Sequence, residues 1–271
     1  MVEDKYWKGF LERNKNNRVL FKYGHLAEPD GSVKCGRLKQ FCAMFLKNKL
    51  YFSDPSKFND PFEFKPRLII NDYEKARKKL EATIIKDGCP ADEAKRISLD
   101  RSSDPRFEAM MGDAYRKHII KSGVFCLTPK WDNQLMWAHY ADGHRGYCLV
   151  FVFKKDSQEI NKLKKVEYPD EYPEFVVEDE DYENSGNKSC LSKSKCWKYE
   201  EEYRLLSPYE GYLDSPTNAL EGIIFGCKMK NEIKDMIVKL NNKRDRQLRL
   251  NETYLDPKEY AIRIRDYNFQ R

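Results

Sequence analysis

The chain has 271 residues, of which 13% are aromatic and 35% charged, and its net charge is +6. This composition is typical of a folded, strongly solvated protein and excludes an intrinsically disordered chain. The length allows one large domain or two small ones. The excess of 50 basic over 44 acidic side chains permits a nucleic-acid partner without requiring one.

Eight cysteines are spread along the chain without a C-x-x-C pair or a histidine at zinc-ligand spacing. The N-terminal sequence MVEDKYWKGF lacks the apolar core of a signal peptide. No run approaches the roughly 20 apolar residues that cross a bilayer. We therefore expect reduced thiols in a cytoplasmic protein, with no membrane association and no metal site.

Hydrophobic periodicity predicts strands and helices along most of the chain. Residues 18–26 alternate as a strand does, with Val19, Phe21 and Tyr23 on one face. Residues 146–153 are almost continuously apolar, which is typical of an interior strand. The other predicted elements are, in chain order, a helix at 38–49, a strand at 49–64 that breaks at Asp54-Pro55, a strand at 123–129, a helix at 133–146, strands at 203–207 and 220–226, a helix at 230–243, and strands at 246–255 and 259–267.

Two segments interrupt this pattern. Within residues 72–121, charged helices are predicted in the segments 72–88 and 105–123, each of which ends at a glycine stop signal; this indicates a helical insertion between sheet elements. Residues 168–192 are first acidic and then lysine-rich, which predicts a long exposed loop. Without internal repeats or a clear linker, we expect a single α+β domain over residues 1–271. Its sheet should be mixed, mostly antiparallel and split, with flanking helices.

Three glutamates stand among aromatic residues in KSKCWKYEEEYRLLSP, residues 193–208. If EEEYRLL forms a strand, Glu200 and Glu202 share one face and Glu201 the other. Two carboxylates on one face repel, which raises the pKa of one and suits acid–base work or the stabilisation of a developing positive charge. Composition alone favours a plainer alternative, a strand edge whose solvated charges pair with Arg204 or with the preceding lysines.

Two further motifs are rich in aromatic residues. Asn59-Asp60-Pro61 favours a turn, and the aromatics around it either wall a pocket for a flat ring or fill a corner of the core. The helix at 133–146 carries an aromatic cluster that is more often core than binding site, and its histidines are poorly spaced for one metal. These side chains are Tyr51, Phe52, Phe58, Phe62 and Phe64 in the first motif and Met136, Trp137, His139, Tyr140 and His144 in the second.

In order along the chain, these motifs resemble a large prokaryotic and phage family long catalogued as a domain of unknown function. They are FKYGHL, LKNKLYFSDPSKFNDPFEF, VFCLTPKWDNQLMWAHYADGHRGYCLVF, KSKCWKYEEEYRLL and LEGIIFG. The resemblance covers nearly the whole chain outside the helical insertion and the acidic segment. It implies a family and leaves the function open, because the family has no settled function. The absence of P-loop, Rossmann and G-x-S-x-G signatures argues against a nucleotide triphosphatase, a Rossmann dehydrogenase and an α/β-hydrolase.

A second resemblance, to the ADP-ribosyltransferase fold, implies a mechanism. In such enzymes a first strand contacts the ribose of NAD, a second strand brings a polar residue and aromatics to the nicotinamide, and a late strand brings a catalytic glutamate. Breaking the nicotinamide–ribose bond passes through an oxocarbenium-like state that a carboxylate stabilises. The resemblance implies NAD contacts from Lys22, Tyr23, Tyr51, Ser53, Phe58 and Asn59, with Glu202 as the catalytic residue and Glu200 as its helper.

One residue departs from that pattern. The first-strand contact is usually histidine or arginine, whereas the candidate here is Lys22, a point charge without a ring or fork. The resemblance implies NAD as substrate and a protein or nucleic-acid acceptor. A toxin, an antiphage defence enzyme and a housekeeping enzyme all fit it.

Two alternatives remain open. The first is a non-catalytic nucleic-acid- or protein-binding component of a defence system, supported by basic clusters such as residues 241–250. The second is a structural role for the same motifs. In that case Trp137, Tyr140, Trp197 and Tyr203 form one aromatic core, and Arg204 bonds a carboxylate such as Asp60.

Overall fold

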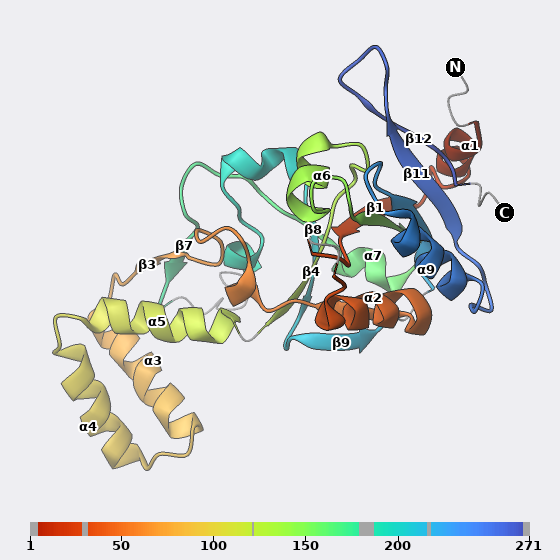
Figure 1. Cartoon of the computed structure of the whole chain (residues 1–271). Coiled ribbons are helices and arrows are strands. Elements are labelled where there is room, and N and C mark those ends of the chain that lie inside the picture. The colour runs from red at the N-terminus through yellow and green to blue at the C-terminus, as the bar shows by residue number, and fades with distance from the viewer. Residues whose placement is uncertain (1–4, 29–31, 121, 179–186, 216–217, 268–271) are drawn as a thin grey trace. The chain divides into compact units, whose positions relative to one another are not determined.

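The computed structural model describes residues 5–28, 32–120, 122–178, 187–215 and 218–267 (Figure 1). The chain divides into two compact units. The first comprises Met1–Ser53, Val124–Val166 and Trp197–Arg271, and the second comprises Asp54–Gly123 and Glu167–Cys196. Helices are combined with mixed sheets, so the predicted α+β class is confirmed.

A five-stranded mixed sheet with the strand order β1-β5-β10-β11-β12 forms the centre of the first unit. The β10–β11 pair is parallel, and the other neighbouring pairs are antiparallel. β5 is buried along its whole length between β1 and β10, which confirms the predicted interior strand. The strands are β1 Arg18–Gly24, β5 Tyr147–Phe153, β10 Leu220–Phe225, β11 Arg249–Leu255 and β12 Ile262–Asp266.

Shorter strands and helices complete the first unit. Two small sheets have the orders β4-β8-β6 and β2-β9, and single bridges join Phe21 to Thr128 and Ser53 to Val124. Helix α6 contacts β1, and α1 contacts β12 (Figure 1). The strands are β2 Lys49–Phe52, β4 Gly123–Leu127, β6 Lys164–Lys165, β8 Tyr203–Ser207 and β9 Gly211–Asp214, and the helices are α1 Lys5–Arg13, α2 Cys35–Lys47, α6 Gln134–Tyr140, α7 Gln158–Lys162 and α9 Asn231–Asn241.

β1 separates two apolar clusters, as its alternation predicts. Leu20 belongs to the cluster that includes Phe41 and Phe125. Phe21 belongs to the other, with Trp137, and Tyr23 packs against that cluster. Lys22 therefore lies on the Leu20 face of β1, where its Nζ sits 4.4 Å from the centroid of the Phe125 ring.

Two glycines allow the backbones at the ends of β5 and β10 to approach closely. The Gly226 N–H donates to the Gly146 carbonyl at 2.9 Å. A Cβ on Gly146 would lie 2.2 Å from the Gly24 carbonyl oxygen, and a Cβ on Gly226 would lie 2.1 Å from the His144 carbonyl oxygen. Only glycine fits at these two positions, and the contact fixes the segment that joins α6 to β5.

The second unit combines a short parallel strand pair with three helices. β3 (Arg67–Ile69) pairs with β7 (Glu174–Val176), and Phe175 and Val177 are each 2% exposed. The prediction of an exposed loop at 168–192 is therefore wrong for this part of it, because apolar side chains among the acids are buried. The remaining elements are η1 Pro55–Lys57, α3 Tyr73–Lys86, α4 Ala91–Ser102 and α5 Phe107–Ile120.

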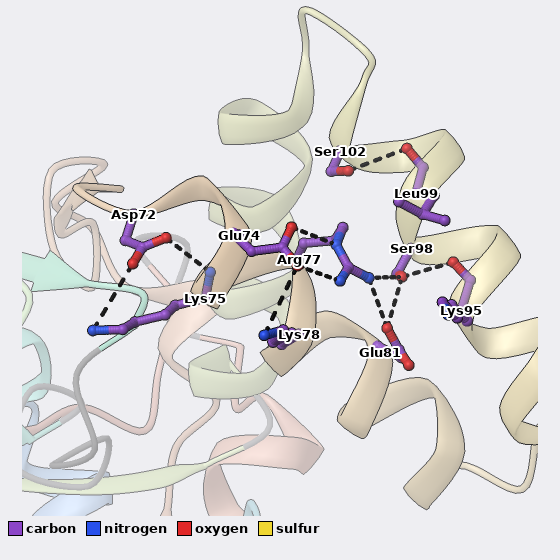
Figure 2. Close-up of polar contacts among 10 residues, drawn as sticks. All are labelled: Asp72, Glu74, Lys75, Arg77, Lys78, Glu81, Lys95, Ser98, Leu99 and Ser102. Carbon is purple, nitrogen blue, oxygen red and sulfur yellow. Dashed lines mark hydrogen bonds and ion pairs between the residues drawn. The ribbon is translucent and has the colours of Figure 1, made fainter.

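The α3–α4 hairpin within the predicted helical insertion is held by a polar cluster (Figure 2). The Arg77 guanidinium donates to Glu74 through Nε at 3.0 Å and Nη2 at 2.6 Å. Its Nη1 donates to Glu81 at 2.7 Å and to Ser98 of α4 at 3.0 Å. Because Ala76, Ala94 and Ser98 are the fully buried side chains here, apolar contacts are few and the arginine links the two helices.

We expect Arg77→Met to loosen this hairpin. Methionine keeps the apolar stem but removes the Nη1 donor that Ser98 and Glu81 share. Backbone amides of α3 and α4 should exchange with solvent at least about tenfold faster, as in local unfolding. Arg96→Met, on an exposed arginine of α4, is the matched control and should leave exchange unchanged. Equal exchange in the two variants would contradict the assignment.

Candidate functional site

The three glutamates do not lie on one strand, which corrects the sequence-based expectation. Glu200 ends the 3-10 helix η2 (Lys195–Glu200), and β8 begins only at Tyr203. Glu201 adopts a left-handed backbone conformation with φ of 45°. This residue therefore interrupts the extended backbone that would have placed Glu200 and Glu202 on one face of a strand. Glu200 and Glu202 consequently have different surroundings, although both are buried, at 3% and 4% exposure.

Glu202 forms a buried two-point ion pair with Arg204. Arg204 Nε donates to Oε1 and Nη2 donates to Oε2, each at 2.9 Å. The arginine side chain is fully buried and that of the glutamate is 5% exposed. The planar guanidinium fixes both the charge and the plane of the carboxylate. Arg204 thus bonds a carboxylate internally, as the structural alternative supposed, and that carboxylate is Glu202.

Lys22 of β1 and Cys126 of β4 complete what we call the polar centre, the four residues Lys22, Cys126, Glu202 and Arg204. Burial lowers the pKa of Lys22, while the charges of Cys126 and Glu202 oppose that shift. Burial, and then Glu202, raise the pKa of the Cys126 thiol. Lys22 Nζ also donates to the Cys126 carbonyl at 3.2 Å. Lys22 and Cys126 are half-buried, so they are the accessible members of the centre.

The residues before β8 are tied to the β4–α6 connection. Thr128 Oγ1 donates to the Glu200 carbonyl at 2.6 Å. Asn133 begins helix α6 by accepting from the Leu135 N–H, and its Nδ2 donates to the Tyr199 carbonyl at 3.0 Å. The Glu202 carbonyl accepts from the Val166 N–H at 2.9 Å. These bonds hold the backbone that carries both carboxylates.

Glu200 has its own partner on helix α6. The Tyr140 hydroxyl donates to Glu200 Oε1 at 2.7 Å. Beside this pair, His139 packs against Trp197 and Tyr199 with ring centroids 6.0 and 6.4 Å away. The predicted core of Trp137, Tyr140, Trp197 and Tyr203 is not gathered here, because Trp137 meets Tyr23 edge-on and stacks on His144, and Arg18 lies over the Tyr203 ring.

Tyr23 does not join Lys22, because neighbouring residues of a strand point to opposite faces. Its hydroxyl donates to the Lys130 carbonyl at 2.9 Å, and its ring meets Trp137 edge-on at 5.1 Å. Burial raises the pKa of this phenol above its ordinary range. In this arrangement Lys22, rather than Tyr23, is the first-strand residue that contacts β4 through the Cys126 carbonyl.

The other predicted contacts are divided between the units. Tyr51 packs on Tyr212 of β9 at 5.0 Å. Ser53 pairs with Val124 through two backbone hydrogen bonds of 2.9 Å. Phe58 and Asn59 belong to the second unit, where Phe58 meets Phe64 edge-on at 5.4 Å and Asn59 is exposed. Their assignment as NAD contacts stays a prediction.

The basic cluster at 241–250 is engaged within the first unit. Arg246 Nη2 donates to Glu221 at 2.9 Å, and Arg244 lies over the Phe45 ring at 5.4 Å. Asn241 is buried and bonds both backbone polar groups of Leu248, at 2.9 and 3.0 Å. Much of this cluster is therefore engaged by β10, by α2 and by the residue before β11.

Two searches of the described residues gave no candidates. No cluster of three or more His, Cys, Asp or Glu side chains there could hold a metal ion. No helix in the same part of the chain is long and apolar enough to span a bilayer.

Sequence reasoning missed Cys126 and the role of Tyr140. Both lie in quoted motifs, VFCLTP and LMWAHY, but neither has a spacing that points to the glutamates. The sequence did contain a signal for Arg204. It stands two residues after Glu202, and in an extended chain the two side chains can lie on the same face.

Comparison with known proteins agrees with the first resemblance. Residues 136–205 match the model of a family described as "Protein of unknown function (DUF2971)". The matched segment runs from helix α6 to β8, so it includes Tyr140, both buried glutamates and Arg204. No curated protein and no solved structure matched the chain.

We expect Glu202→Gln to destabilise the chain by about 3–5 kcal/mol, because it leaves the buried Arg204 charge uncompensated. The double variant Glu202→Leu with Arg204→Met should recover most of that loss, since a buried pair can be replaced by apolar groups of similar size. Denaturant unfolding measures both.

Glu201→Gln is the matched control. Glu201 pairs with Lys130 at 3.3 Å, and both side chains are about half exposed. Its loss should change the free energy of unfolding by less than about 0.5 kcal/mol. A Glu202→Gln chain as stable as this control would show that the buried pair does not constrain the fold.

Proposed function

We propose that the chain is an ADP-ribosyltransferase-like enzyme that takes NAD as substrate and modifies a macromolecule. One observation carries the proposal. Lys22 on the first strand donates to the Cys126 carbonyl of β4 at 3.2 Å, and β4 neighbours β8, the late strand that Glu202 precedes. The resemblance implied this pair of contacts from the order of the motifs.

The geometry of Glu202 suits charge stabilisation better than proton transfer. Both carboxylate oxygens accept hydrogen bonds from Arg204, which favours the ionised form. A fixed negative charge beside the ribose would favour the oxocarbenium-like state in which the C1′–N1 bond breaks and its electron pair leaves with nicotinamide.

Lys22 supplies the complementary contact. NAD carries a pyrophosphate and ribose hydroxyls, and a half-buried ammonium can donate to either. Glu200 accepts a hydrogen bond from Tyr140 instead of from Arg204, and we assign it to the acceptor: the acceptor nucleophile would bond C1′ and release its proton to Glu200 or to solvent. This division gives the two glutamates different roles.

The competing interpretation is structural, and it has one observation in its favour. The Glu202–Arg204 pair is almost completely buried, as an internal ion pair of the core would be. Under that interpretation Lys22 only packs on Phe125 and bonds the Cys126 carbonyl. A destabilised Glu202 variant would lose NAD turnover under either interpretation. The test therefore needs a substitution that leaves the Glu202–Arg204 pair intact.

Lys22→Met is that substitution. It removes the ammonium, keeps the stem on Phe125 and leaves no buried charge unpaired. We expect it to reduce nicotinamide release from NAD at least about tenfold with unfolding unchanged, whereas Lys15→Met, on an exposed lysine of the same unit, should have no effect. The readouts are nicotinamide release and NAD binding by calorimetry on the full chain.

The stability-restored double variant at Glu202 and Arg204 extends the test. It should fold and release nicotinamide at least about a hundredfold more slowly, the usual effect of removing one stabilising group. Full turnover in that variant, or no NAD binding to the unchanged chain at millimolar concentration, would leave the structural interpretation in place.

A further inference from the structure

The second unit contains a cavity of about 630 Å³ that the polar centre does not use. All of its walls come from that unit, namely from residues 62–67, 169–173 and 189–195. The volume lies within the range of small-ligand sites, which is about 300–1,000 Å³. The motif FNDPFEF supplies one of these walls. The sequence alone allowed two roles for this motif, the wall of a pocket or a corner of the apolar core.

Backbone pairing fixes the walls. The Arg67 N–H donates to the Pro173 carbonyl at 3.0 Å, at the start of the parallel β3–β7 pair. The Lys193 N–H donates to the Glu167 carbonyl at 3.0 Å. A buried ion pair joins the first wall to the third, because Lys193 Nζ lies 3.3 Å from Glu63 with both side chains less than 5% exposed. The cavity is thus part of the folded unit.

The lining combines aromatic rings with an excess of positive charge. Phe64 is buried at 3%, whereas Phe62 and Tyr172 are 59% and 45% exposed. Exposed rings of this size at the edge of a cavity offer stacking faces. Four basic side chains line the cavity against two acidic ones, Asp170 and Glu171, and three serine hydroxyls lie among them.

Most of the basic side chains can exchange their partners for a ligand. Lys65 is exposed and makes no ion pair with any residue that the structure describes. Arg67 pairs with Glu174 at 3.5 Å, and Lys195 pairs with Asp170; all four of these side chains are more than half exposed. Exposed pairs contribute little free energy, so phosphate oxygens can replace the carboxylates.

From this chemistry we propose that the cavity binds a nucleotide unit, with its base stacked on Phe62 or Tyr172 and its phosphate held by Lys65 and its basic neighbours. Stacking on aromatic rings together with cationic contacts to phosphate is how proteins hold single-stranded nucleic acid and nucleotides. The unit can be a free mononucleotide or one residue of a single strand. The proposal is independent of NAD cleavage at the polar centre.

The test measures binding of fluorescein-labelled octauridylate RNA to the full chain by anisotropy, and of AMP by calorimetry, at 50 mM salt. We expect Phe62→Ala to weaken binding of the RNA at least about fivefold through lost stacking. Lys65→Glu should weaken it similarly. Raising the salt to 200 mM should weaken it at least about fivefold if two phosphates are contacted.

Tyr209→Ala and Lys78→Glu are matched controls, because both side chains are exposed and neither lines the cavity. They should leave binding unchanged. If AMP binds and displaces the RNA, the ligand is a free nucleotide; if only the RNA binds, it is a strand. Both results support the site.

Other results overturn the proposal. These are binding of neither probe at 50 mM salt, or equal binding by all four variants. A third is displacement by polyglutamate with no effect of Phe62→Ala, which would identify an acidic protein segment as the occupant. None of these results depends on nicotinamide release, so this proposal and the proposed function can fail separately.

Discussion

The arrangement of the polar centre depends on one buried ion pair, Glu202 with Arg204. Burying two charges destabilises a fold unless each charge has a partner of opposite sign. Here the Arg204 guanidinium donates to both oxygens of the Glu202 carboxylate. Because the pair spans the entry into β8, it fixes the orientation of the carboxylate just before the strand begins. The Val166 and Thr128 hydrogen bonds hold the same stretch of backbone from outside.

That constraint separates two glutamates that look equivalent in the sequence. The left-handed turn at Glu201 gives Glu202 an arginine and Glu200 a tyrosine as partners. A carboxylate held by an arginine stays charged and oriented, which suits electrostatic stabilisation. An E-x-E motif can thus place its two carboxylates against different partners through backbone geometry.

The apolar framework could be predicted from the sequence, because β1 and β5 are governed by burial and periodicity. α4 and β7 could not. α4 buries only Ala94 and Ser98 and so lacks an apolar stripe, and the acids around β7 conceal Phe175. Lys22 and Glu202 could be proposed from a resemblance. The left-handed turn at Glu201 and the place of Cys126 in the polar centre could not, because both depend on tertiary contacts that no local pattern encodes. Whether residues 1–271 act as one domain stays a prediction.

The most direct measurement of the central claim is the lysine Cε chemical shift of Lys22 in the ¹³C-labelled full chain, assigned by its loss in Lys22→Met. Burial beside Phe125 should make this amine titrate below the ordinary lysine range. The account predicts that NAD shifts the Lys22 signal saturably while the exposed lysines stay unchanged. A Lys22 signal that does not move at millimolar NAD would contradict the assignment of the polar centre as an NAD site.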